Sequence, residues 1–261
     1  MSVFRLIWLF VRLGVMNELE YRTNFFFQLF QTALGLVAAL AQLAIIFSHT
    51  DSFAGWRPAE MIGLLGVFFI VGGAIRTFIQ PSMQRFMEDV RQGTLDFTLT
   101  KPEDAQVLVS VKQVEVWKLI DVGLGLALIG VALVRLGETV GLAQALGFVA
   151  ALLAGSAMVY SFFLVLATCT FWFVRLENIL VIFQAMWEAG RWPAWIYPPW
   201  LRYTLTFIVP VAFATTVPAE ALAGRLTLET LLGALALAVG LLAFSRWFWT
   251  VGIRHYSGAS A

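Results

Sequence analysis

Long apolar segments alternate with short polar ones along this chain, and the pattern predicts membrane-spanning helices. Residues 23–48 contain no Asp, Glu, Lys or Arg, and neither do residues 139–174. An uncharged apolar run of about 18 residues is long enough to cross a bilayer as a helix. The fold class expected from this pattern is an all-α membrane protein that forms one transmembrane domain over residues 1–261.

Polar breaks divide the apolar sequence into six expected spans. These spans are Phe25–Phe47, Met61–Ile79, Leu119–Leu136, a helix within Gln144–Val174, Asn178–Trp192 and Leu228–Trp249. Between the last two lies a region rich in proline and tryptophan, residues 193–226. Proline breaks helices, and broken backbone at membrane depth must be satisfied by protein or water. We expect a hairpin over Pro199–Val217 that enters the outer leaflet and returns; a loop followed by a surface helix is the alternative.

The first 22 residues predict a helix that lies in the membrane interface. Four of their apolar side chains share one helical face, namely Phe4, Trp8, Val11 and Val15, with Arg5 and Arg12 elsewhere. Amphipathic helices of this kind can lie in the plane of the membrane surface. Arg12 interrupts the apolar core and no small-residue cleavage site follows, which disfavours a signal peptide. A plain extension of the first span is the alternative.

Lysine and arginine set the expected orientation, because cytoplasmic loops carry an excess of both. With six spans and a cytoplasmic N-terminus, the outer side receives Arg57, Arg135, Arg191, Arg202 and Arg225. The other basic residues among the 17, including every lysine, fall on or near the cytoplasmic side. Both termini are therefore expected in the cytoplasm, together with the long polar segment over residues 81–118.

Several function classes are disfavoured by what the sequence lacks. A net charge of +1 without a basic block predicts no nucleic-acid partner. A P-loop needs a lysine directly after glycine, and the lysines at positions 101, 112 and 118 do not meet this requirement. No catalytic constellation and no metal-ligand cluster is visible, since Cys169, His49 and His255 stand alone. We therefore expect no enzyme activity, no catalytic residues and no metal or other cofactor in this chain.

Ion-coupled transport requires ionisable groups at bilayer depth. The candidates are Arg76, Asp121, Glu177 and Glu188, and all lie near the ends of their expected spans. Snorkelling or structural pairing is the favoured interpretation of these residues. An ion-coupled secondary transporter is thus a weaker alternative, and a non-transporting membrane scaffold is a third.

The polar segment holds two patterns that suit a soluble partner. MQRFMEDVRQG predicts a helix that stops at Gly93. TLDFTLTKP then alternates Leu95, Phe97 and Leu99 with polar residues, and the residue before Pro102 is biased toward extended backbone. We expect this stretch to present apolar side chains and charges to a partner in the cytoplasm.

Four stretches resemble the ABC-2 type permeases of bacterial ABC exporters. They are NELEYRTNFFFQ (17–28), VRQGTLDFTLTKP (90–102), YPPWLRYTLTFIVPVAF (197–213) and RHYSGASA (254–261). The resemblance implies six transmembrane helices, an N-terminal elbow helix and a re-entrant hairpin before the last helix, in the bacterial inner membrane. It also implies export of an unidentified substrate, driven by separate ATPase subunits that bind ATP and Mg²⁺. A second permease, often a different one, is implied as the partner of this chain, and a homodimer is the alternative.

The resemblance also indicates which residues would act. The loop after the second span would couple to the ATPase, and its candidate residues here are Arg85, Arg91, Gly93, Leu95, Asp96 and Pro102. A path along the first, second and fifth spans would carry an amphipathic or cationic-aromatic cargo. Its candidate contacts are Phe26, Phe27, Gln31, Phe68 and Phe69. Alternatively, Gly93 and Pro102 only shape the loop, and the phenylalanines face lipid or the core.

Overall fold

The computed structural model describes residues 22–137, 141–173 and 177–256. Every regular element in these ranges is a helix, and one isolated bridge joins Phe53 to Trp56. The expected all-α fold is therefore confirmed. The expected interfacial helix over residues 1–22 lies outside the described ranges, except for Arg22.

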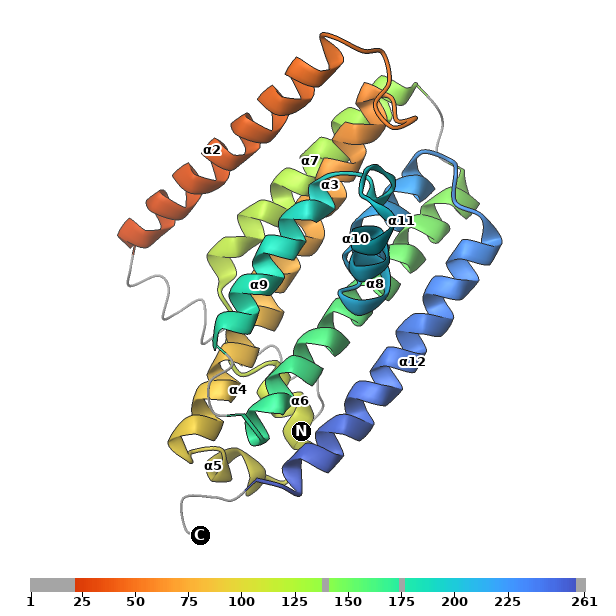
Figure 1. Ribbon diagram of the computed structural model, residues 1–261. Coiled ribbons are helices and arrows are strands. Elements are labelled where there is room, and N and C mark those ends of the chain that lie inside the picture. Colours follow the sequence, from red (N-terminus) through yellow and green to blue (C-terminus); the bar gives the residue numbers. More distant parts are fainter. Residues whose placement is uncertain (1–21, 138–140, 174–176, 257–261) are drawn as a thin grey trace.

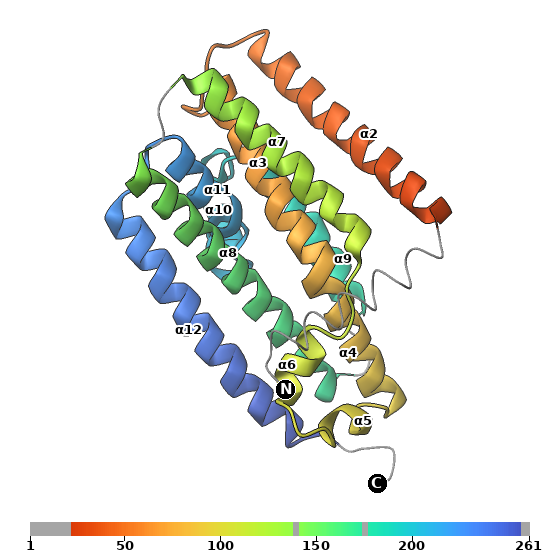
Figure 2. The same ribbon diagram turned by 180° about the vertical axis from the view of Figure 1, so that it is seen from behind.

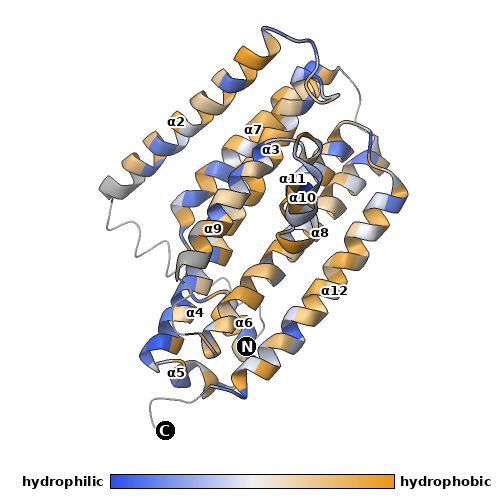
Figure 3. Ribbon diagram, viewed as in Figure 1, coloured by the Kyte–Doolittle hydropathy of each residue, from blue (hydrophilic) through white to orange (hydrophobic). Residues whose placement is uncertain are grey.

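Five of the described helices are long and apolar enough to cross a membrane. They run side by side as a bundle, with α2 standing apart at one edge and α12 at the other (Figures 1 and 2). Polar residues gather around α4 at one end of this bundle (Figure 3). The five are α2 (Arg22–Phe47), α3 (Pro58–Ala74), α7 (Leu119–Leu136), α8 (Leu142–Thr168) and α12 (Leu228–Ile253).

The fifth crossing differs from the single span that the sequence predicts. The helix α9 (Glu177–Glu188) has 12 residues, or about 18 Å, against the roughly 30 Å of a hydrocarbon core. In Figure 1, however, α8 ends and α9 begins at the end of the bundle that holds α4, whereas α12 begins at the opposite end. The chain between α8 and α12 therefore runs the length of the bundle in several short pieces.

The last of these pieces are α10 (Pro199–Tyr203) and α11 (Val211–Leu222), which meet at a bend of 92°. A π-helical turn, Thr204–Ile208, ends α10, and the N–H of Val209 donates to the carbonyl of Thr204 at 2.8 Å. Pro210 follows and cannot continue the helix because it has no N–H. The region of the expected hairpin thus bends at Val209 and Pro210, and its re-entrant course through a leaflet stays a prediction.

The second span is longer than predicted, because it continues as one rod into the polar segment. The helix α3, a π-helical turn (Ile75–Ile79) and α4 (Gln80–Gln92) form 35 consecutive helical residues. At 1.5 Å per residue the rod measures about 52 Å, well beyond the hydrocarbon core. About 20 Å of helix therefore extends past one membrane surface.

Pro81 stands inside this rod and frees the carbonyl four residues earlier, that of Thr77. The N–H of Glu115 donates to that carbonyl at 3.0 Å, and the N–H of Gln80 donates to Ile75 across the π turn. The hydrogen bond from Glu115 also ties the chain that returns toward α7 to the side of the rod.

Glycine allows α3 and α7 to approach each other closely. A β carbon on Gly125 would lie 2.6 Å from the backbone oxygen of Gly66. One on Gly66 would lie 2.8 Å from the Cγ1 of Ile129. Small residues let helix backbones meet in this way within membranes, so the α3–α7 pair forms the tight centre of the bundle.

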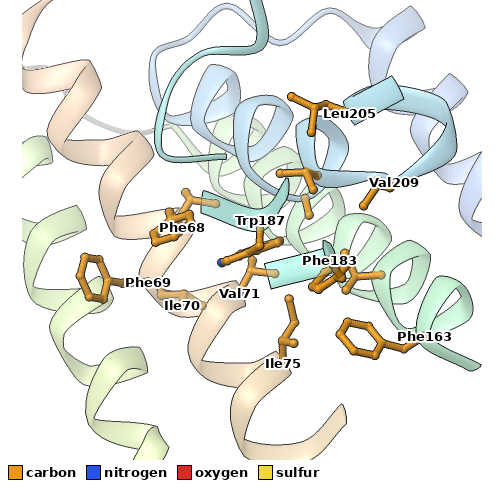
Figure 4. Packing of buried hydrophobic residues seen from close by; sticks show 14 of the residues in the cluster. Phe68, Phe69, Ile70, Val71, Ile75, Phe163, Phe183, Trp187, Leu205 and Val209 are labelled. Atoms are coloured by element: carbon orange, nitrogen blue, oxygen red, sulfur yellow. The ribbon is translucent and has the colours of Figure 1, made fainter. Parts of the chain in front are cut away.

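An aromatic cluster joins α9 to this centre (Figure 4). The rings of Phe68 and Trp187 stack at 5.4 Å, and those of Phe163 and Phe183 meet edge to face at 4.4 Å. Such pairs add attraction beyond simple burial. The short helix α9 is therefore held by ring packing against α3 and α8.

We predict that Gly125→Leu lowers the thermal unfolding midpoint by several degrees in detergent, because overpacking a tight contact costs about 1–3 kcal/mol. Gly130→Leu on the same helix is the control, since nothing lies within 4 Å of a β carbon there. Equal midpoints for the two variants would contradict the close α3–α7 contact.

Candidate functional site

The polar segment over residues 81–118, here named the cap, folds at the end of the bundle where α12 finishes (Figure 1). It contains most of α4, followed by α5 (Asp96–Leu99), α6 (Ala105–Ser110) and a 3₁₀ turn, Val116–Lys118. Met83 and Phe86 of α4 and Val109 of α6 are fully buried. The cap therefore has a packed core of its own that is continuous with the bundle.

The helix α4 ends at Gly93, as the sequence predicts. Gly93 has φ 71° and ψ 14°, a left-handed conformation that glycine adopts without steric cost. Its N–H donates to the carbonyl of Val90, and the N–H of Thr94 donates to that of Asp89 at 2.9 Å. These bonds satisfy the last carbonyls of the helix and turn the chain sharply into α5.

The alternation of apolar and polar residues after Gly93 does not correspond to an extended segment, because residues 96–99 form a helical turn. The N–H groups of Thr98 and Leu99 both donate to the carbonyl of Leu95, at 2.8 and 3.1 Å. A helical period replaces the alternation, so Leu95 is completely buried while Phe97 is 75% exposed. The turn ends at Leu99, and Pro102 follows on the surface.

Asp89 is the buried centre of the cap, with an exposed fraction of 1%. It forms ion pairs with Lys112 and, at 3.2 Å, with Arg85. The hydroxyl of Thr94 donates to the same carboxylate at 3.2 Å, and Lys112 also donates to the hydroxyl of Thr98. Burial of a charge requires such partners, and Asp89 thereby joins α4, α5 and the chain that follows α6.

A second polar contact fastens the cap to α12. Arg246 donates to both carboxylate oxygens of Asp104, at 3.0 and 2.6 Å, and to Gln106 at 2.8 Å. The hydrogen bond from this guanidinium lowers the pKa of Asp104 below its ordinary value. Tyr160 on α8 lies 2.7 Å from the hydroxyl of Ser110 and accepts from Gln106 at 3.3 Å.

Among the predicted coupling residues, Arg85 joins the Asp89 centre, whereas Arg91 pairs with Glu88 on the surface of α4. Leu95 is buried in the core of the cap, where it holds α5 in place without contributing to the exposed surface. Asp96 is half-buried at the start of α5, and Pro102 is exposed. The coupling role of these residues stays a prediction. Asp89, Lys112 and the Asp104–Arg246 contact are absent from the sequence-based set.

The predicted cargo contacts do not come together on one surface. Phe68 and Phe69 are buried in the core, with exposed fractions of 1% and 5%. Phe26 and Phe27 are about two-thirds exposed on α2, where Gln31 is exposed as well. The set therefore divides between the core and the open face of α2, and its role in a path stays a prediction.

A buried ion pair joins three helices near the point where the rod leaves the span. Arg76 donates to one oxygen of Asp121 through Nη2 at 2.7 Å and Nε at 3.1 Å. Thr32 donates to the other oxygen at 3.0 Å. Arg76 lies in the π turn about 27 Å along the rod from Pro58, which is near the end of a span that faces the cap. The pairing expected for Arg76 and Asp121 is thus found, and it connects α2, α3 and α7.

We predict that Arg76→Met strongly destabilises the protein, since it leaves the carboxylate of Asp121 buried without its cation. Loss of one partner from a buried pair costs about 3–5 kcal/mol, whereas replacing both by apolar residues is often neutral. The double variant Arg76→Met/Asp121→Leu should therefore recover most of the unfolding midpoint. A double variant that melts below both single variants would contradict this account.

The cap, the rod and the bundle lie in a chain that a family model matches almost throughout. The model is described as "ABC-2 family transporter protein", and it matches residues 33–260. The match includes the cap and most of every span-length helix in the described ranges. No curated protein matches the chain. From the match over most of its length, the chain belongs to the ABC-2 transporter family.

Proposed function

We propose that this chain is the membrane-spanning permease subunit of an ATP-driven exporter, and that separate ATPase subunits dock on the cap. The observation that carries the proposal is the rigid continuity of the cap with α3 in a chain of the ABC-2 family. The ATPase subunits bind ATP and Mg²⁺, and this chain supplies the surface on which they push. Its place is the bacterial inner membrane, with both termini and the cap in the cytoplasm.

Phe97 supports docking on the cap. Its side chain projects from α5 with three-quarters of its surface exposed, while Leu95 and Thr98 of the same turn are buried. Burial of Leu95 and Thr98 fixes α5 against the rest of the cap, so the ring of Phe97 points outward. Aromatic anchors surrounded by polar residues carry much of the binding energy in protein interfaces, and the exposed Arg91 side chain lies on the adjacent α4.

Two connections carry movement from the cap into the bundle. The first is the rod itself, braced by the hydrogen bond from Glu115 to Thr77. The second is the contact of Asp104 with Arg246, which joins the cap to α12. When the ATPases close on ATP, these connections move α3 and α12 together, and the cargo path opens by alternating access or lateral extrusion.

The open face of α2 supports a second permease in the assembly. Its exposed apolar side chains are Phe26, Phe27, Phe30, Leu34, Val37 and Ile45. A contiguous apolar face on a membrane helix packs against lipid or another helix. We propose a different permease as the partner, with a homodimer as the alternative, and the cargo is an amphipathic molecule that passes between the two.

The tagged protein, purified in mild detergent, should bring down an ABC ATPase and its ATP hydrolysis. Phe97→Asp should lose this partner, because it removes the exposed aromatic ring and adds a charge. Ser52→Asp introduces the same charge in the exposed loop at the opposite end of the bundle and should retain the ATPase.

If folded wild-type protein brings down no ATPase, the exporter proposal fails. Gradient-driven transport without a partner would then favour a secondary transporter, and a stable complex without cargo movement would favour a scaffold.

The contact of Arg246 with the cap can be tested by hydrogen exchange. Arg246→Leu should raise amide hydrogen exchange in α6 several-fold, since the residue holds both Asp104 and Gln106. Arg135→Leu, an exposed position at the far end of α7, serves as the control. Unchanged exchange in α6 of the Arg246 variant would show that the contact does not hold the cap.

A further inference from the structure

A cavity of about 440 Å³ lies between the rod and α9, near the inner end of the span. Ile75 and Phe183 give it apolar walls, and Figure 4 shows these side chains pointing toward Trp187 from the two helices. The residues with polar groups in its lining are Arg76, Gln80, Gln184, Trp187 and Glu188. The cavity is thus apolar in its walls and carries a small group of hydrogen-bond donors.

Two of these donors have unused hydrogens. Arg76 uses Nε and Nη2 to bind Asp121, and its Nη1 group has no partner among the described residues, although 29% of the side chain stays exposed. The indole nitrogen of Trp187 is buried and likewise lacks a hydrogen-bond partner in the described part of the chain. Guanidinium and indole N–H groups can only donate, so the matching ligand atom must accept.

Gly72 lies where these donors converge. A β carbon at this position would lie 3.0 Å from the indole nitrogen of Trp187 and 3.3 Å from the Nη2 of Arg76. Any other side chain here would therefore crowd the indole against the guanidinium. The indole packs directly against Gly72, so a ligand atom between the two donors requires a displacement of α9 from α3.

The unused donors around the cavity favour an anion over a cation. Both charged groups that line the cavity are paired within the protein, Glu188 with Arg191 and Arg76 with Asp121, each at 2.7 Å. The groups left to meet a ligand are therefore N–H donors, which suit anionic oxygens, and the buried rings of Phe68 and Phe69 are not available to stack on a cation. These two rings therefore give no support to a cationic-aromatic cargo in this cavity.

We propose that the cavity binds the anionic head group, a phosphate or a carboxylate, of an amphipathic cargo. This inference rests on the proposed export function and names the chemical class of its substrate. Gly72 and Arg76 lie about 21 and 27 Å along the rod from Pro58, which corresponds to the inner leaflet. The head group enters there with its oxygens on Arg76 and Trp187 and its tail along the apolar walls.

The test is a binding titration of the purified full-length chain in an uncharged detergent. Dodecyl phosphate, dodecyltrimethylammonium and inorganic phosphate are the three probes, since the first two share a tail and differ in charge. Dodecyl phosphate should bind, and the other two should bind at least tenfold more weakly. Equal or tighter binding of the cationic probe overturns the charge assignment, and equal binding of inorganic phosphate overturns the requirement for an amphiphile.

Two variants locate the site. Trp187→Phe keeps the ring that stacks on Phe68 and removes only the N–H, and Gly72→Ala fills the space between the donors. Each should weaken dodecyl phosphate about tenfold, the loss expected for one hydrogen bond to a charged group. Gly130→Ala, whose β carbon has open space, should bind as wild type. Unchanged binding in Trp187→Phe and Gly72→Ala overturns the site.

A final arm separates a cargo from a resident membrane lipid. In the complex with its ATPase, dodecyl phosphate should raise ATP hydrolysis at least twofold, and binding without any change in hydrolysis overturns the cargo assignment. If an ATPase co-purifies but dodecyl phosphate does not bind, this inference fails while the proposed function stands.

Discussion

A backbone carbonyl inside a membrane must have a donor, and in this protein one such requirement shapes the region around the cap. Pro81 removes the N–H that would have satisfied the carbonyl of Thr77, and the N–H of Glu115 takes its place at 3.0 Å. The rod can therefore continue past the proline with this carbonyl satisfied. The same bond brings the chain that follows the cap back against α3, so that α3, the cap and the start of α7 form one connected unit.

Charged side chains reinforce this unit at three levels. Arg76 and Asp121 connect α2, the rod and α7 near the end of the span that faces the cap, and Asp89 holds the cap together beneath its surface. The more exposed pair of Asp104 and Arg246 reaches across to α12. Exposed pairs contribute little to stability by themselves. The geometry of this pair nevertheless ties the cap directly to α12.

The proposed cavity lies at the middle of the rod, and the proposed docking surface lies beyond the end of the rod that forms α4. Phe97 projects from the cap beyond α4, whereas Gly72 and Arg76 face α9 from the span. Because the rod is continuous between them, a displacement of the cap shifts the wall of the cavity relative to α9. The π turn contains Ile75 and Arg76 and so forms part of the cavity wall, and π-helical turns often occur at functional positions.

Much of the architecture could be predicted from the sequence, because membrane spans depend on local composition. Uncharged apolar runs predict where most of the spans lie, and Gly93 predicts the end of α4. The helical turn at Leu95 was missed since alternation and a single turn are hard to distinguish over four residues. The short α9 was missed because its apolar run continues into a 3₁₀ turn. The pairing of Asp89 with Lys112, and the burial of Phe68, depend on contacts between distant segments that no local pattern encodes.

The central claim is that the cap is the surface on which an ATPase docks, and site-specific photo-crosslinking in cells tests it most directly. A photoreactive phenylalanine analogue would replace Phe97 on the cap in one variant. In a second variant it would replace Val134, which is exposed at the end of α7 that lies away from the cap. The account predicts that position 97 crosslinks to an ABC ATPase subunit and that position 134 does not. Well-folded protein that yields no ATPase adduct from position 97, or the same adduct from both positions, would contradict it.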